Sequence, residues 1–236
     1  METIDIDHLP PESINEIFQK VPFIKKVIEA DSTQRQFFLD NSKIFNAKPG
    51  EDIIKRGEFN HWVYFLMVGQ LLVYPEFSDQ RNHMVNFISA GEMFGEMAII
   101  REFDRNTTLI ADPNCRKIIY LGTNFSAFGK IDDFTQVSIS TKICFYLSAI
   151  TVIRKRLEIM KIDYPENDLV QKSVTLKLYA GEKNSLHELL YLQDQAKFFT
   201  KRLVKWNRAL EIETDFCGFK VWAPDQLLGK IKNFSI

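Results

Sequence analysis

The chain has 236 residues, 45% of them hydrophobic and 26% charged, which is enough for one large domain or two small ones and is unlike the composition of a disordered protein. The formal net charge of −1 argues against a surface that attracts nucleic acid or anionic lipid as a whole. Three cysteines and four histidines are scattered without metal-ligand spacing, no leader peptide is recognisable, and no apolar run reaches the roughly 20 residues of a membrane helix. We therefore expect a cytoplasmic protein without a metal site or a membrane span.

Residues 1–42 have the apolar spacing of helices. After Pro10 and Pro11, hydrophobic residues recur every three or four positions as far as residue 30. Pro22 falls inside this pattern and predicts a break or a kink, because proline lacks the N–H group that a helix interior needs. We predict an N-terminal helical region that ends near residue 42.

Residues 43–122 change to short β-prone runs that are separated by turn signals. The glycines of these turns are Gly50, Gly57, Gly69 and Gly91. Many short strands at regular spacing are typical of a sandwich or barrel. Residues 96–103, EMAIIREF, are the exception, because they could form one or two turns of helix between strands.

A helical pattern returns from about residue 124 to residue 160. Its apolar residues alternate in steps of four and three, which is the 3.5-residue period of a coiled-coil seam. They are Ile139, Ile143, Tyr146, Ile150, Ile153, Leu157 and Met160. Two interpretations stay open. The stripe could be a homodimer seam, from Ile139 to Leu157, or the face by which the helix packs on its own barrel.

Residues 161–236 are predicted to be mostly helical after Pro165 ends the preceding helix. A second apolar stripe follows Ser185, which is a favourable N-cap residue. The stripe consists of Leu189, Leu192, Ala196, Phe199, Leu203, Trp206 and Leu210. Residues 165–184 fit helix and strand equally, and the tail predicts a short strand and then a helix near Pro224. The chain thus divides into residues 1–42, 43–160 and 161–236.

The segment FGEMAIIREFDRNTTLIA, residues 94–111, carries the main functional signal. Gly95 before a short helical turn exposes backbone N–H groups that favour an anion. Arg105, on the following strand, can offer a forked donor to a phosphate. A carboxylate beside a phosphate would repel it, so Glu96 is better suited to accept hydrogen bonds from sugar hydroxyls. This combination suits a ribose phosphate.

The same segment resembles the phosphate-binding cassette of the cyclic nucleotide-binding domain family, which reads roughly F-G-E, two or three apolar residues, a variable turn, then Arg and small polar residues. KPGEDIIKRGE, VYFLMVGQLLVY and ISAGEMFGE resemble the family's preceding strands and turns, in the family's order. The resemblance covers about residues 20–160. It implies an α+β fold in which a double-stranded β-helix, or jelly-roll β-barrel, is flanked by N-terminal helices, a long capping or dimerisation helix and a mostly helical C-terminal region.

The resemblance also implies residue roles. Glu96 would bind the ribose 2′-hydroxyl and Arg105 the phosphate of cAMP or cGMP, while the helix after the barrel would cover the base. The implied ligand-binding residues are Phe94, Gly95, Glu96, Met97, Ala98, Arg105, Asn106 and Thr107, with Val85 and Phe87 lining the base pocket. Family members that prefer cGMP often carry Thr or Ser at the position of Asn106, and those that prefer cAMP often carry Ala. The base therefore stays open, with a slight preference for cAMP.

The sequence holds no protease, hydrolase, P-loop or kinase motif, so we do not expect an enzyme. We predict a regulatory sensor in signal transduction whose capping helix or dimer arrangement changes on ligand binding and which acts on an unidentified downstream protein.

The alternative is a DNA-binding transcription regulator that resembles the Crp/Fnr family, with a divergent winged helix in residues 185–236. Five cations without an acid among them favour this alternative: Lys197, Lys201, Arg202, Lys205 and Arg208. A solvated helix face explains the same cations. The unbroken stripe from Leu189 to Leu210 speaks against DNA binding, because a helix-turn-helix needs a tight turn.

Overall fold

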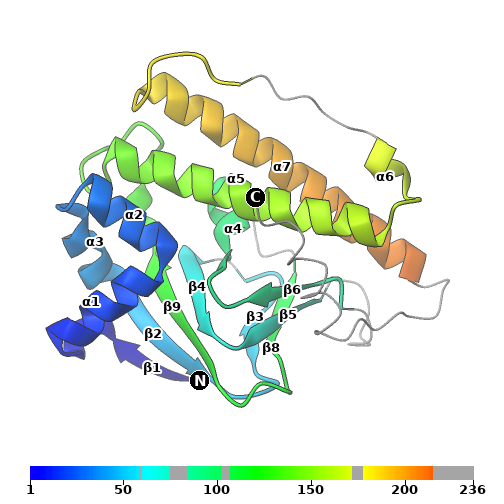
Figure 1. Cartoon of the computed structure of the whole chain (residues 1–236), viewed down its shortest axis with the longest axis horizontal. Coiled ribbons are helices and arrows are strands. Elements are labelled where there is room, and N and C mark those ends of the chain that lie inside the picture. Colours follow the sequence, from blue (N-terminus) through cyan, green and yellow to red (C-terminus); the bar gives the residue numbers. More distant parts are fainter. Residues whose placement is uncertain (59, 75–83, 102–106, 172–177, 215–236) are drawn as a thin grey trace.

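The computed structural model shows an α+β protein in which two antiparallel sheets are flanked by short N-terminal helices along one side and by two long helices along another (Figure 1). The structure describes residues 1–58, 60–74, 84–101, 107–171 and 178–214, and for residues 171 and 210–214 it describes only the backbone. The predicted α+β jelly-roll fold is confirmed.

The two sheets form the β-roll. One sheet has the strand order β1-β2-β9-β4-β7, with β1 Glu2–Asp5, β2 Ser42–Ala47, β4 Trp62–Val68, β7 Met93–Phe94 and β9 Ile118–Asn124. The other has the order β3-β8-β5-β6, with β3 Asp52–Ile54, β5 Gln70–Tyr74, β6 Asn86–Ser89 and β8 Thr108–Ala111. Gly69 joins β4 to β5 with a φ of 92°, and a Cβ there would lie 2.6 Å from the carbonyl oxygen of Lys117. Glycine is therefore required at this turn.

The N-terminal region is helical, as predicted, except at its start. It contains the 3-10 helix η1 (Ile6–His8) and the helices α1 (Pro11–Lys20), α2 (Pro22–Ala30) and α3 (Gln34–Asn41). Pro22 is the first residue of α2. Proline is tolerated there because an N–H group in the first turn of a helix has no acceptor within the helix. The helical prediction is wrong for residues 2–5, because they pair with the edge of β2 in the register Ile4 to Ile44. Backbone pairing overrides the weak local pattern there.

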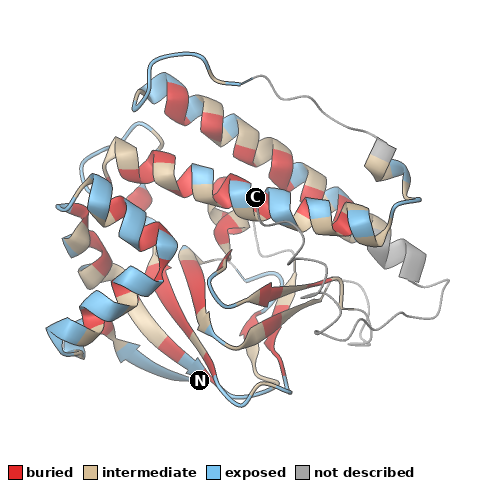
Figure 2. Ribbon diagram, viewed as in Figure 1, coloured by how far each residue is buried: buried red, intermediate tan, exposed pale blue. Residues whose placement is uncertain are grey.

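Two hydrophobic clusters hold the fold together (Figure 2). One fills the space between the two sheets and includes the stacked rings of Phe45 and Tyr120, 5.0 Å apart. The other joins the N-terminal helices to the outer face of the first sheet and to the long helices that follow the β-roll. Phe23 lies at its centre, with its ring stacked 5.4 Å from that of Phe65. Many of the chain's 20 phenylalanines are buried and pack in the two clusters.

Helix α5 (Ile139–Asp163) contains the first predicted stripe, and this stripe lies in the chain's own core. Ile143, Tyr146, Ile150, Ile153, Leu157 and Met160 are buried, and Ile139 is partly buried. The partners of α5 are α2 and α7, which pack against it. The prediction of a homodimer seam through these residues is therefore withdrawn. Side chains that are already buried within one chain cannot also form the contact with a second copy. Of the two interpretations, packing within the chain is the one that the structure shows.

The start of α5 is fixed by a buried lysine. Lys142 has no exposed surface, and its Nζ donates to the carbonyl oxygen of Lys130 at 2.6 Å. The ammonium group also lies 4.9 Å from the centre of the Phe128 ring. Burial lowers the pKa of this amine, and the nearby Asp133 carboxylate opposes that change. This interaction ties α5 to the loop that precedes it and follows η2 (Ser126–Phe128).

Helix α7 (Leu186–Thr214) follows the short helix α6 (Asp168–Gln171) and lies alongside α5 (Figure 1). Its stripe from Leu189 to Trp206 is buried against α5, and Leu210 has a side chain outside the described residues. The predicted N-cap is present, because Ser185 Oγ accepts from the N–H of Glu188 at 3.2 Å and Glu188 in turn accepts from the N–H of Asn184 at 2.7 Å.

The continuity of α7 bears on the DNA-binding alternative. Residues 186–214 form one helix without a turn, so the described part of the C-terminal region has no helix-turn-helix. The predicted strand and helix near Pro224 fall on residues 215–236, which lie outside the described residues. Residues 186–214 therefore contain no helix-turn-helix of the Crp/Fnr-like type, and for residues 215–236 the alternative stays untested.

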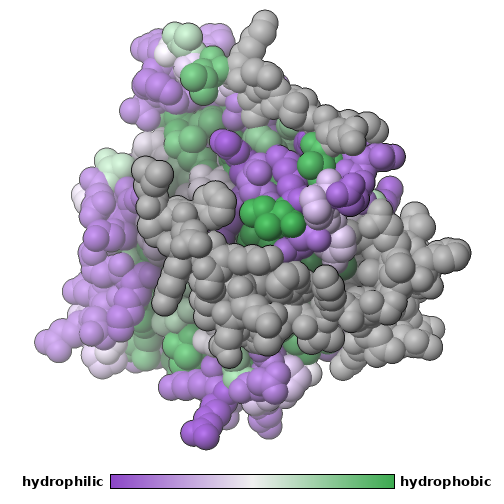
Figure 3. Space-filling view, turned by 45° about the vertical axis from the view of Figure 1, so that its right-hand side comes forward, coloured by the Kyte–Doolittle hydropathy of each residue, from purple (hydrophilic) through white to green (hydrophobic). Residues whose placement is uncertain are grey.

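The described surface is mainly hydrophilic on the face shown in Figure 3, with smaller hydrophobic areas between the hydrophilic ones. Its exposed large hydrophobic residues are distributed over several elements, for example Val68 at the end of β4, Leu147 on α5 and Leu190 on α7. Isolated apolar side chains of this kind are normal on protein surfaces. Among the described residues no helix is long and apolar enough to cross a membrane.

Candidate functional site

A cavity of about 430 Å³ lies between the second sheet, helix α4 (Glu96–Arg101), α5 and α7. This volume is within the range of small-molecule sites, roughly 300–1,000 Å³. Its polar lining residues are Arg56, Asn86, Glu96, Arg101, Thr107, Arg156, Asn207 and Arg208. Its apolar lining residues include Ile54, Val73, Ile88, Phe94, Leu109 and Leu203. Four arginines and a single carboxylate give the described lining an excess of positive charge, which suits an anion.

The predicted cassette turn forms one wall. Phe94 ends β7, and Gly95 follows it with a φ of 80°, a conformation that glycine adopts without strain. The chain then enters α4, whose first residue is Glu96. The one or two helical turns expected from the sequence are present as α4 between the strands, and Glu96 has no exposed surface.

Glu96 is completely buried and is held by an arginine from α5. Its Oε1 accepts from Arg156 Nη1 at 2.8 Å, and Arg156 Nη2 donates to the carbonyl oxygen of Met93 at 2.9 Å. Burying a carboxylate is unfavourable unless a positive charge and hydrogen bonds compensate, and Arg156 supplies both. This pair joins α5 to the cassette across 60 positions of sequence.

The other carboxylate oxygen of Glu96 has no such partner. Oε2 is buried, and among the described residues no donor lies within hydrogen-bond distance of it. Buried acceptors are nearly always paired, and an unpaired one costs about 1–3 kcal/mol. Because Glu96 lines the cavity, a hydroxyl group of a bound molecule would satisfy this oxygen.

A second ion pair attaches α5 to the segment just before the cassette. Lys155 pairs with Glu92, which precedes β7. Lys155 is about half exposed and Glu92 is 17% exposed, so this pair is worth far less than the buried one next to it. Two consecutive cations of α5 thus contact both ends of β7. Because of these ion pairs, a displacement of the cassette would also displace this part of α5.

The opposite wall is a row of residues across the second sheet. Ile54 of β3 faces Leu109 of β8, Leu109 faces Val73 of β5, and Val73 faces Asn86 of β6. All four line the cavity. Neighbouring strands are about 4.8 Å apart, so the row extends for about 14 Å. It is apolar except at its last member, Asn86, on the edge strand β6.

Six of the predicted site residues line this one cavity: Phe94, Gly95, Glu96, Met97, Ala98 and Thr107. Arg105 and Asn106 lie outside the described residues, so their roles stay predictions. Val85 and Phe87 are not among the lining residues, and their neighbours Asn86 and Ile88 take that place. Side chains alternate between the two faces of a strand, and Val85 packs against the other hydrophobic cluster, so the roles of Val85 and Phe87 in a base pocket stay predictions.

Several lining residues were missed from the sequence. The cassette motif does not point to Arg156, yet this residue is the partner of Glu96. Leu203, Val204, Asn207 and Arg208 come from α7, so this helix, together with α5, covers the cavity. Arg208 belongs to the basic cluster that was interpreted as a solvated face or a DNA contact; it is exposed, and it also borders the cavity. Only long-range packing shows these contacts, because α4 and α7 meet across about 100 residues.

Comparisons with known proteins agree with this architecture. Residues 44–125 match the family model of the cyclic nucleotide-binding domain. Over 163 residues the chain is 25% identical to a cGMP-dependent protein kinase of Plasmodium berghei, an alignment that covers 66% of this chain and 17% of the kinase. The predicted resemblance is confirmed for residues 44–125, which match the cyclic nucleotide-binding domain.

Two solved structures are similar over about half of the chain. The regulatory domain of Toxoplasma gondii PKA with cAMP is 22% identical at a TM-score of 0.40, and the match covers 50% of this chain and 46% of that one. The regulatory subunit of a cAMP-independent protein kinase A from Trypanosoma cruzi, bound to guanosine, is 24% identical at a TM-score of 0.40, and the match covers 48% of this chain and 38% of that one.

Metal binding has no support from side-chain geometry within the described ranges. No group of three or more His, Cys, Asp or Glu residues there is arranged to hold a metal ion. Half of the polar lining residues of the cavity are arginines, whose guanidinium groups only donate hydrogen bonds and carry a positive charge.

Proposed function

We propose that this protein binds a cyclic nucleotide in the cavity between the β-roll, α4 and α7, and that it serves as a non-catalytic regulatory sensor. The observation that carries the proposal is the buried Glu96, which lines a ligand-sized cavity and whose Oε2 has no hydrogen-bond partner among the described residues. It stands at the position where the family motif places the carboxylate that binds the ribose. The match of residues 44–125 to the cyclic nucleotide-binding domain supports this proposal.

The chemistry of the cavity walls fits the three parts of such a ligand. The ribose 2′-hydroxyl would donate to Glu96 Oε2. The cyclic phosphate carries one negative charge and would be bound by Arg105 and by the backbone around Gly95, as the motif implies. The base would lie on the apolar row of Ile54, Leu109 and Val73, since a flat aromatic ring is best buried against apolar side chains.

Signal output would pass through α5 and α7. Arg156 and Lys155 of α5 hold the cassette, and Leu203, Val204, Asn207 and Arg208 of α7 line the cavity. A ligand that binds one arrangement of these helices more tightly than another shifts the population by that difference in affinity. A downstream protein that contacts α5 or α7 would detect this shift.

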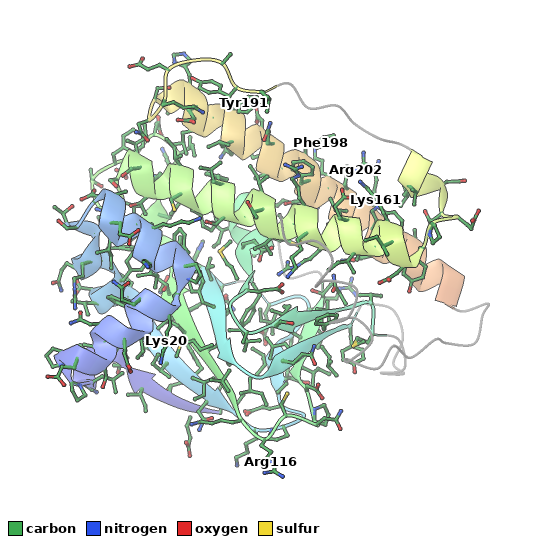
Figure 4. The ribbon with its side chains drawn as sticks, in the orientation of Figure 1. Lys20, Arg116, Lys161, Tyr191, Phe198 and Arg202 are labelled. Atoms are coloured by element: carbon green, nitrogen blue, oxygen red, sulfur yellow. The ribbon has the colours of Figure 1, made fainter. Side chains whose placement is uncertain are left out.

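The direct test replaces the arginine that the motif assigns to the phosphate. Arg105→Ala should raise the Kd for cAMP and for cGMP by about 10–150-fold, because a charge-assisted hydrogen bond contributes about 1.5–3 kcal/mol. Arg116→Ala is the matched control. Arg116 is exposed in the turn between β8 and β9 and lies at the far end of the molecule from α5 and α7 (Figure 4).

Isothermal titration calorimetry on nucleotide-free protein measures both variants against wild type, with circular dichroism as the check on folding. The proposal fails if Arg105→Ala, correctly folded, binds cyclic nucleotide as tightly as Arg116→Ala does.

A further inference from the structure

We infer that the cavity prefers guanine over adenine and that Asn86 is the residue that reads the base. This inference rests on the proposed function and extends it to the identity of the ligand. It reverses the slight preference for cAMP that the sequence alone suggested.

The amide of Asn86 is fixed in one orientation. Its Oδ1 accepts from the backbone N–H of Phe87 at 2.8 Å. A backbone N–H can only donate, so the atom that faces it has to be the carbonyl oxygen and not the amide nitrogen. The side chain is 9% exposed, which leaves little room for an exchange of the two positions.

The amide nitrogen is the part of Asn86 that remains for a ligand. Among the described residues Nδ2 makes no hydrogen bond. This atom is not fully buried, so a bound molecule can reach it. Asn86 lines the cavity at the end of the cross-strand row. Its Nδ2 therefore offers N–H donors, and no acceptor, at the far end of the apolar surface proposed for the base.

Donors at this place favour guanine for a simple reason. The edge of guanine that carries N7 and O6 consists of two acceptors, whereas the same edge of adenine carries the acceptor N7 and the donor N6–H₂. Adenine would place its N6 hydrogens against those of Nδ2, and a buried donor would lose its partner. A site built around one polar group rejects the analogue that cannot pair with it more strongly than an apolar site rejects a change of size.

The polar groups of α7 on the covering side of the cavity do not oppose this preference. Arg208 can only donate, so it adds to the donors that an acceptor-rich base would satisfy. Asn207 can donate and accept, and therefore by itself selects neither base. In the described lining the one acid is Glu96, which lies on α4 and is assigned to the ribose.

The test compares three ligands on wild-type protein and on two variants of Asn86. Calorimetric titration of wild type with cGMP, cAMP and cyclic inosine monophosphate (cIMP) should give a Kd for cGMP about tenfold or more below that for cAMP. Cyclic IMP has the N7 and O6 of guanine but lacks its 2-amino group, so it should bind nearly as tightly as cGMP. Weak binding of cIMP, at the level of cAMP, would show that another edge of the base is read and would overturn the assignment.

Asn86→Asp keeps the bond to the Phe87 N–H and changes the free atom from a donor to an acceptor. It should abolish or invert the preference for cGMP. Asn86→Val removes the donor without adding a charge, so it should reduce the ratio of the two Kd values to about one even if Asn86→Asp fails to fold. Asn46→Asp, the same change at an exposed position of β2, is the control and should leave the ratio unchanged.

Failure of this inference differs from failure of the proposed function. Tight binding of both nucleotides with equal Kd values, or an Asn86→Val variant that keeps the wild-type ratio, would overturn the role of Asn86 and leave the nucleotide site intact. Absence of binding of all three ligands would overturn the proposed function itself, and this inference with it.

Discussion

Removal of Arg156 tests how the cassette is held against α5. The residue donates to Glu96 Oε1 at 2.8 Å and to the Met93 carbonyl oxygen at 2.9 Å, and its side chain is 12% exposed. Arg156→Ala would leave a carboxylate without exposed surface and without its counter-charge. Loss of one partner of a buried ion pair costs about 3–5 kcal/mol, and for a chain of this length that lowers Tm by about 6–20 °C.

Lys155→Ala is the matched control for this experiment. The residue is the neighbour of Arg156 on the same helix, and it also pairs with a carboxylate next to β7, but the pair lies near the surface. We expect a loss of at most about 1 kcal/mol. Thermal and denaturant unfolding, followed by circular dichroism, measure both variants. A Tm for Arg156→Ala as high as that for Lys155→Ala would refute the reasoning.

A second substitution separates the buried charge from the lost packing. In the Arg156→Ala background, Glu96→Gln should restore part of the lost stability, because a neutral amide no longer requires a counter-charge. The interaction energy of the two changes, obtained from a double-mutant cycle, should therefore be large. Strictly additive effects would show that the two side chains do not depend on each other.

Two further predictions concern the long helices. Ser185→Ala should lower the unfolding free energy by about 1 kcal/mol, because the N-cap bond to the Glu188 N–H is lost, and an unchanged denaturation midpoint would contradict this. Burial holds the pKa of the Lys142 amine below its ordinary value of 10.5, so the unfolded chain binds more protons between the two values. Wild type should therefore gain unfolding free energy relative to Lys142→Met as the pH rises through this window, and parallel curves for the two proteins would speak against it.

The two apolar stripes show what periodicity can establish. Both were visible in the sequence, and both form long helices. A 3.5-residue period indicates that a helix face is buried, but it does not identify the partner. In the structure the two stripes pack against each other, which answers the question that was left open for the residues from Ile143 to Leu157.

The cassette illustrates the opposite case, in which a local motif names neighbouring residues that line one cavity. Gly95 and Glu96 are neighbours in sequence, and the backbone turn between β7 and α4 needs only local residues. Arg156 is 60 residues away, on a helix face that carries no apolar signal, so only the packing of α5 on the β-roll brings it to Glu96.

Strand β6 shows what a motif leaves undetermined. The resemblance assigned Val85 and Phe87 to the base pocket by their position in the family's order. Side chains alternate between the two faces of a strand, so a shift of one residue changes which of them point into the cavity. In the structure Val85 packs against the hydrophobic cluster beyond the sheet, and Asn86 lines the cavity.

The most direct test of the account is calorimetric titration of the nucleotide-free wild-type protein with cGMP and with cAMP. We predict saturable binding of one nucleotide per chain, with cGMP bound more tightly. Absence of binding of either nucleotide at millimolar concentration would contradict the central claim that this cavity is a cyclic nucleotide site.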